Sequence, residues 1–337
     1  MTWVWVVVSV LVALPLFGIL YQHIGAWLDR RKYPPAGRML HLAGCDLHVW
    51  EQGSGSPAVI FESGIAASSL SWAHVQPELA KELRTCSYDR AGLGWSSLPR
   101  TAYTLELFVA HLETLLANAK IEAPYILVGH SFGSLLIRAF AAVHPTSVAG
   151  LVLVDPVSIE SWAAATPRDL QRLRAGAYFS RRGALLARFG IVRFALAAAS
   201  LRHKGLTKTI AKVSAGKATA TLTRLVGEVQ KLPPAVLPVA RAEWSLPKCF
   251  EAMARHLEIL PQCAAAIKQM ELPPGVPVAI LSASTATERE LHERESWIQD
   301  RLGSNHRVVP GTGHWLHLER PDVVAAAVRE VAANHTG

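Results

Sequence analysis

The segment Gly129–Gly133, which reads Gly-His-Ser-Phe-Gly, restricts the fold of this chain more than any other feature. It follows an apolar, strand-like run at 125–128 and precedes a helical pattern at 134–143, so the G-x-S-x-G pattern stands at a strand-to-helix turn. Glycine is needed on both sides because a side chain there would collide with the adjacent strand or helix. The turn would hold Ser131 at the carboxyl end of the strand, in front of a helix N-terminus that favours negative charge. We therefore predict that Ser131 is a nucleophile.

Strand-like and helical patterns alternate along most of the chain. In 104–119 the apolar residues fall on one helical face, and a final helix at 321–333 opens with proline in its first turn. This alternation predicts an α/β fold with a mostly parallel sheet and helices on both of its faces. The predicted strands are 38–42, 46–50, 58–61, 85–88, 125–128, 151–154, 276–281 and 307–309.

The segment 156–272 lacks strand patterns and is predicted to be a helical cap inserted between two strands. It holds 18 Lys and Arg against 7 Asp and Glu, whereas the whole chain has a net charge of +8, so the basicity belongs to the cap. Arginines alternate with apolar residues in 184–194, which favours contact with a membrane surface over nucleic acid; an ordinary helix with a solvated face is the alternative. Six apolar cap residues either line the access route of an apolar substrate or form the core of the cap: Leu185, Leu186, Phe189, Ile191, Val192 and Phe194.

The first 28 residues contain no Asp, Glu, Lys or Arg, and Trp3–Leu20 is almost entirely apolar. That length is near the minimum for crossing a bilayer. A cleaved signal peptide typically has positive charge before the apolar run and a small-residue cleavage site after it. Neither feature is clear in this sequence, so we predict an uncleaved anchor. The basic residues of 30–32 follow the anchor and predict a catalytic domain on the cytoplasmic side. The predicted organisation is anchor 1–28, linker 29–37, core 38–155, cap 156–272 and core 273–337.

A nucleophilic serine requires a base and an acid that orients it. His314 lies in a glycine-rich loop after the last predicted strand, whereas His317 starts the following helical segment. The acid is either Asp155, directly after the strand 151–154, or Glu288, the first carboxylate after the later strand.

The oxyanion of an acyl-transfer reaction requires two N–H donors. We expect one from Phe132, the residue after the nucleophile, and the other from Ile65 in the loop after the third strand. Glu62 at the end of that strand is expected to form a structural ion pair with Arg90.

These motifs together resemble the α/β-hydrolase fold superfamily, and in particular membrane-anchored bacterial serine hydrolases with the Tyr-Asp-Arg-Ala-Gly signature found here at Tyr88–Gly92. The resemblance covers about 38–155 and 275–334. It implies Ser131 as nucleophile, His314 as base, and Phe132 and Ile65 as oxyanion donors.

Within the superfamily, the dehalogenase branch supports Asp155 as the acid. Two departures stand out: Ser63 replaces the usual histidine before the oxyanion residue, and the later loop lacks its usual aspartate. A serine nucleophile also argues against haloalkane dehalogenation and epoxide hydrolysis, which proceed through an aspartyl ester.

The expected function is that of a membrane-anchored serine hydrolase of carboxylesterase or lipase type, acting on small apolar esters through an acyl-enzyme. Thioesterase, peptidase, carbon–carbon hydrolase and perhydrolase activities share the triad and stay open, as does a catalytically silent binding module. We expect no cofactor or metal, because the four cysteines are far apart and no nucleotide-binding fingerprint is present. The expected partners are the ester and membrane lipid, with no nucleic acid.

Overall fold

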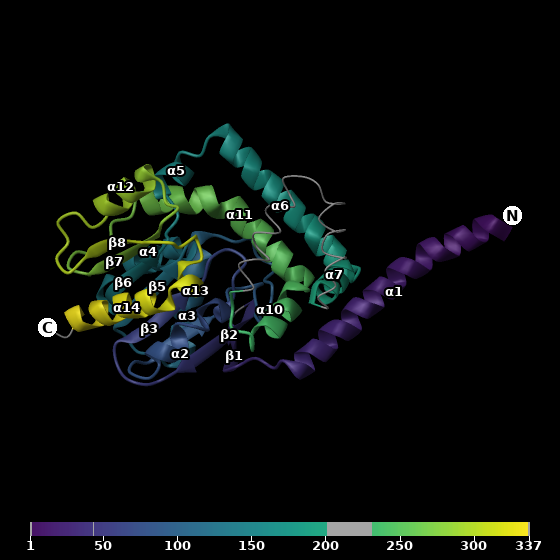
Figure 1. Ribbon diagram of the computed structural model, residues 1–337, viewed down its shortest axis with the longest axis horizontal. Helices are drawn as coiled ribbons and strands as arrows, with labels where there is room; N and C mark the ends of the chain where they lie inside the picture. The colour runs from purple at the N-terminus through teal and green to yellow at the C-terminus, as the bar shows by residue number, and fades with distance from the viewer. Residues whose placement is uncertain (1, 43, 201–230, 336–337) are drawn as a thin grey trace.

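The structure, a computed structural model, describes residues 2–42, 44–200 and 231–335 (Figure 1). Its centre is an eight-stranded sheet in the order β1-β2-β4-β3-β5-β6-β7-β8. Strand β2 pairs antiparallel with both β1 and β4, and the other five pairs are parallel, which confirms the predicted, mostly parallel sheet. The strands are β1 (Arg38–Leu42), β2 (Cys45–Gln52), β3 (Ala58–Glu62), β4 (Thr85–Tyr88), β5 (Tyr125–His130), β6 (Val148–Val154), β7 (Val278–Ala283) and β8 (Asn305–Val309).

Both faces of this sheet are buried, as parallel sheets require. On one face, residues such as Ile60 and Leu127 pack in the same cluster as helices α3 (Leu105–Ala119) and α4 (Gly133–Val143). On the other face, strand residues such as Phe61 pack with further helices. Those covering the second face include α2 (Gln76–Leu79) and α14 (Pro321–His335).

Every element described between β6 and β7 and before residue 272 is helical, with 201–230 outside the described residues. These cap helices are α5 (Ile159–Ala163), α6 (Pro167–Arg188), α7 (Ile191–Ser200), α10 (Leu237–Trp244) and α11 (Pro247–Lys268). The last of them packs along α6 and α5 (Figure 1).

The interpretation of the apolar cap residues as cap core is wrong for four of them. Leu185, Leu186, Ile191 and Phe194 are exposed on the outer surface, and Phe189 and Val192 are half-buried. Their helices turn other, smaller side chains inward, such as Ala184 and Ala187 on α6.

The N-terminal helix α1 (Thr2–Lys32) is long and apolar enough to cross a membrane by length and composition. It projects from the rest of the molecule (Figure 1). The helix continues past the predicted end of the anchor at residue 28 because no proline or glycine lies between residue 28 and Pro34. The linker therefore begins at Tyr33.

The remaining helices are α12 (Glu288–Ser296), α13 (Leu316–Glu319) and the short 3-10 turns Ser69–Trp72 and Pro145–Ser147.

Candidate active site

Ser131 occupies a strained turn between β5 and α4. Its φ of 53° is in the left-handed region, at a cost of about 1–3 kcal/mol for a non-glycine residue, and its N–H donates to Val154 O at 3.0 Å. A Cβ on Gly133 would lie 2.4 Å from the carbonyl oxygen of Glu62, and one on Gly129 would lie 2.8 Å from Gly133 O. Both glycines are therefore required by close backbone packing, as the sequence predicts.

His314 lies over this serine, with its Nε2 2.9 Å from Ser131 Oγ. It comes from the loop after β8, and this loop is fixed on both sides of the histidine. Thr312 O accepts the Ser284 hydroxyl at 2.8 Å, and Gly313 N–H donates to Glu319 Oε2 at 2.6 Å. The imidazole is thereby positioned, while its side chain stays 37% exposed for contact with a ligand.

Asp155 completes the row, with its Oδ2 2.6 Å from His314 Nδ1. It follows β6 directly with a left-handed φ of 40°, and its N–H donates to Leu281 O at 2.7 Å. Burial raises the pKa of this carboxyl, but the His314 hydrogen bond and charge, with Arg294, outweigh burial and lower the pKa overall. The structure thus holds an ionised carboxylate on the far nitrogen of the imidazole.

Glu288 does not join this group. It is the exposed first residue of α12, and Asp155 holds the position on His314 Nδ1. Thr287 caps that helix and exchanges hydrogen bonds with Glu290, so this segment has an ordinary helix-starting role.

Arg294 is a residue of this site that sequence reasoning missed. Its buried guanidinium donates to the second Asp155 oxygen, Oδ1, at 3.0 Å, to Ser282 Oγ at 2.7 Å and to Pro156 O at 2.5 Å. The same Oδ1 accepts the N–H of Ala283 at 3.1 Å. Arg294 sits on an otherwise polar helix, α12, so no pattern in the sequence distinguishes it from a solvated arginine.

The loop after β3 lies directly against the serine. A Cβ on Gly64 would lie 3.4 Å from Ser131 Cβ and 2.9 Å from His130 Nδ1. Ile65, half-buried, is the next residue of this loop. The amide of Phe132 is at the start of α4, where helix N–H groups have no partner within the helix. The backbone at Gly64 therefore lies close to Ser131, and the two expected donors are the residues that follow Gly64 and Ser131 in the sequence.

Residues of the Tyr-Asp-Arg signature form hydrogen bonds that hold the loop after β3 in place. Arg90 donates to the carbonyl oxygens of Ser63 and Gly64, the latter at 2.5 Å, and forms the predicted ion pair with Glu62. Tyr88 donates to the same carboxylate. Asp89 accepts the N–H of Ser69 at 2.7 Å, further along the loop.

The histidine inside the motif, His130, also has a structural role. Its Nε2 donates to the carbonyl oxygen of His314 at 2.8 Å, which ties the two loops together. Burial, with the neighbouring charges of His317 and His314, lowers its pKa well below the usual value, so it stays neutral. His317 is buried beneath it with ring centroids 4.3 Å apart, and burial lowers its pKa to about 3.

A small cavity of about 30 Å³ is lined by residues of both the cap and the core. Two of its core residues, Ala67 and Trp315, follow the Gly64 loop and His314 in the sequence. Its cap residues are Leu232, Ala240 and Trp244, and the remaining lining residues are Ser68, Leu70, Ser71 and Leu318.

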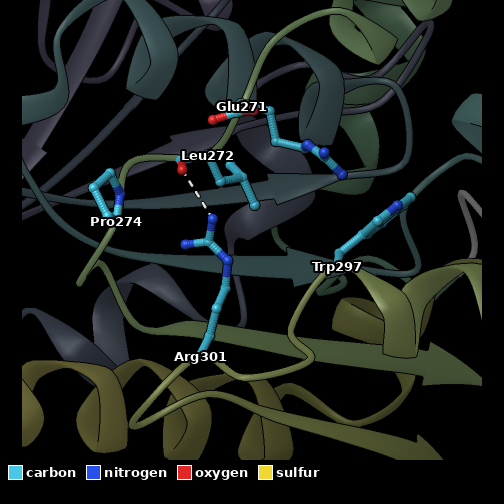
Figure 2. Close-up of a pocket in the computed structure, with 6 residues that line it drawn as sticks. Glu271, Leu272, Pro274, Trp297 and Arg301 are labelled. Atoms are coloured by element: carbon cyan, nitrogen blue, oxygen red, sulfur yellow. Dashed lines mark hydrogen bonds between the residues drawn. The ribbon is translucent and has the colours of Figure 1, made fainter.

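A larger, more open cavity of about 300 Å³ lies elsewhere, around Glu271, Leu272, Trp297 and Arg301 (Figure 2). Arg301 points across it and donates to the Leu272 carbonyl at 2.8 Å. None of Ser131, His314 and Asp155 lines either cavity. Trp315, the neighbour of His314 in the sequence, lines the small cavity, so we take the small cavity as the candidate for substrate.

Comparisons with known proteins agree with this fold. The family model described as the alpha/beta hydrolase fold matches residues 57–321. A solved structure from Pseudomonas aeruginosa, described provisionally as an epoxide hydrolase, is similar with a TM-score of 0.64, 22% identity and coverage of 89% of this chain and 95% of that one. A thermophilic esterase from Thermogutta terrifontis is similar with a TM-score of 0.56 and 19% identity, over 88% of this chain and 99% of that one.

Curated relatives match over shorter stretches. The 2-hydroxy-6-oxo-2,4-heptadienoate hydrolase of Pseudomonas putida is 34% identical over 127 residues, which is 36% of this chain and 45% of the relative. The chain spans less than half the length of the first curated relatives it matches.

The match of the family model extends over most of the chain and agrees with the sheet order and the strand-to-helix turn. The chain belongs to the α/β-hydrolase fold family.

Proposed function

We propose that this chain is a serine hydrolase that cleaves carboxylic esters through an acyl-enzyme. The observation that carries this proposal is the continuous row Ser131–His314–Asp155, with distances of 2.9 Å and 2.6 Å. Such a row activates a hydroxyl because the imidazole accepts its proton while the carboxylate stabilises the resulting cation.

The proposed reaction has two halves. His314 Nε2 takes the Ser131 proton as Oγ attacks the ester carbonyl, and the amides of Phe132 and Ile65 donate to the oxyanion. The intermediate collapses as His314 returns the proton to the leaving alcohol, which leaves the acyl group on Ser131. A water, deprotonated by His314, then attacks the acyl-enzyme and releases the carboxylic acid and the free serine.

One feature supports an ester with an apolar portion. The small cavity between residues of the cap and the core has mostly apolar lining residues, including Leu232, Trp244 and Trp315. We further propose that α1 anchors the enzyme in a membrane with the catalytic domain on the cytoplasmic side.

A second candidate reaction is the one for which the Pseudomonas putida relative is named, the hydrolysis of a 2-hydroxy-6-oxo dienoate. The silent binding module is less favoured, because Asp155 lies on His314 where a triad acid is needed.

The test compares p-nitrophenyl esters of increasing acyl length with that dienoate, using the full chain in detergent and the Ser131→Ala variant. We expect ester turnover that the substitution abolishes. Turnover of the dienoate alone would replace the ester assignment, and turnover of neither by folded protein would overturn the enzyme proposal.

A further inference from the structure

The second half of α1 packs against the cap. Gln22 and Ala26 are buried, although the preceding part of the helix is exposed. A Cβ on Gly18 would lie 2.4 Å from the carbonyl oxygen of Phe189, and one on Gly190 would lie 2.7 Å from the ring of Tyr21. Helix α1 and the turn between α6 and α7 therefore approach as closely as their backbones allow.

Arg193 on α7 holds this contact together. Its Nε donates to Gln22 Oε1 at 3.0 Å, its Nη1 pairs with Asp29, and its Nη2 donates to Ser245 Oγ at 2.7 Å. Gln22 in turn donates from Nε2 to Ser245 O at 3.0 Å. One largely buried guanidinium thus joins α1, α7 and the end of α10, and every nitrogen it carries has a partner.

The same contact reaches the candidate substrate cavity. Ser245 follows Trp244 at the end of α10, and Trp244 lines the small cavity between cap and core. Trp315, next to His314 in the sequence, also lines that cavity. The residue that accepts from Arg193 is therefore the sequence neighbour of a residue that lines the candidate substrate cavity.

The cap also lies at a defined level along α1. Trp3–Leu20 spans about 26 Å at about 1.5 Å per residue, close to the roughly 30 Å of a bilayer core. Among the described residues of the cap, contacts with α1 begin at Gly18, near the end of this apolar run, so α7 lies where α1 would leave the hydrocarbon (Figure 1).

At that level the cap exposes apolar side chains among basic ones. Ile191 is 51% and Phe194 66% exposed on α7, and Leu185 and Leu186 are exposed on the adjoining end of α6. The arginines 182 and 188 are exposed beside them. Apolar side chains interleaved with arginines suit the boundary of a bilayer with anionic headgroups. We call Leu185, Leu186, Ile191 and Phe194 the outer cap patch.

We infer that α1 is a structural part of the cap as well as an anchor, and that the outer cap patch lies on an anionic lipid surface so that the enzyme takes its esters from the bilayer. This inference rests on the proposed function for its substrate class, amphipathic esters with a lipid-like chain, and on the α1–cap contacts for its geometry. The cap residues that line the small cavity, such as Trp244, would be held near the membrane from which the ester is taken.

The first arm of the test measures docking without activity. The full chain is reconstituted in vesicles of phosphatidylcholine and phosphatidylglycerol, with an environment-sensitive fluorophore on Phe194→Cys. The four native cysteines are all buried, so labelling is confined to the new one. Leu302→Cys, at a 94% exposed position outside the cap sequence, is the matched control. We expect brominated lipids to quench the probe at 194 and not at 302; equal quenching, or none at 194, would overturn the inference.

The second arm measures the substrate preference. Ile191→Asp and Phe194→Asp are expected to lower hydrolysis of methylumbelliferyl palmitate in vesicles about tenfold relative to hydrolysis of soluble p-nitrophenyl acetate, with Leu302→Asp unchanged in that ratio. An unchanged ratio in the two cap variants would contradict bilayer delivery. If the unmodified chain cleaves neither ester, the proposed function fails, while the quenching arm still decides whether the cap docks.

Discussion

The turn at Ser131 and the cap are held in place in different ways. Around Ser131 the chain is fixed by backbone geometry: left-handed φ angles at Ser131 and Asp155, close-packed glycines, and amides that donate across strand ends. In the cap, contacts between elements far apart in sequence depend on long side chains, above all Arg193, which joins α1, α7 and α10. Substitutions at the turn should therefore change the rate of the reaction, whereas substitutions at the cap should weaken the attachment of the cap to α1.

The largest effect is expected from Asp155→Asn. It removes the carboxylate on His314 Nδ1, so kcat should fall about 10⁴-fold while the melting temperature changes little. Steady-state kinetics on a soluble p-nitrophenyl ester would measure this, with Glu288→Gln as the matched control that should retain full activity. A large loss in Glu288→Gln, with activity kept in Asp155→Asn, would show that the acid is misassigned.

A smaller effect is expected from Gly64→Ala. The added methyl would lie 2.9 Å from His130 Nδ1 and 3.4 Å from Ser131 Cβ, so the loop carrying Ile65 must shift. Loss of one oxyanion donor costs about 10²-fold or more in kcat, and we expect a loss of that order with KM little changed. Gly176→Ala inside the cap helix α6 tests the comparison, because it should leave kcat unaltered. Equal effects of the two substitutions would contradict it.

Arg294→Gln should have a moderate effect with a distinctive pH signature. Arg294 contributes to the lowered pKa of Asp155, so its removal raises that pKa and the carboxylate becomes protonated at higher pH. The acid side of the kcat/KM profile should therefore move to higher pH, with about a tenfold loss near neutrality.

The control for this prediction is Arg138→Gln, another buried arginine, which lies over Trp297 and not on Asp155. It should leave the profile in place even if it destabilises the fold, and Arg294→Lys should restore part of the shift. A profile unmoved by Arg294→Gln would limit Arg294 to a structural role.

The smallest effect on chemistry is expected from Arg193→Gln. Loss of its bonds to Gln22, Asp29 and Ser245 should lower the stability of the α1–cap contact by about 2 kcal/mol and the melting temperature by a few degrees. The pH profile on a soluble ester should stay in place. Thermal unfolding in detergent would measure the first effect, and a shifted pH profile would show that the two regions are coupled more tightly than we expect.

Much of the fold and part of the site could be predicted because their signals are local. Strand and helix patterns stand next to Ser131 and His314, so their place at the sheet edge follows from position in the chain. The strand before Ser131 was predicted to end at 128, but it continues to His130 because Gly129 and His130 pair with neighbouring strands despite their poor strand propensity.

Other features could not be predicted, because they depend on contacts across the chain. Asp155 and Glu288 both follow strands, and only the packing of β6 beside β7 places Asp155 on His314. Arg294 reaches Asp155 from 139 residues away, and Arg193 reaches Gln22 from 171 residues away. Neither contact leaves a periodic signal in the sequence.

The most direct test of the central claim, an activated serine at position 131, is labelling of the full chain by a fluorophosphonate probe. The account predicts labelling of the unmodified chain, none of Ser131→Ala, and labelling slowed by orders of magnitude in Asp155→Asn but not in Glu288→Gln. Folded protein that is not labelled, or that is labelled equally after Ser131→Ala, would contradict it.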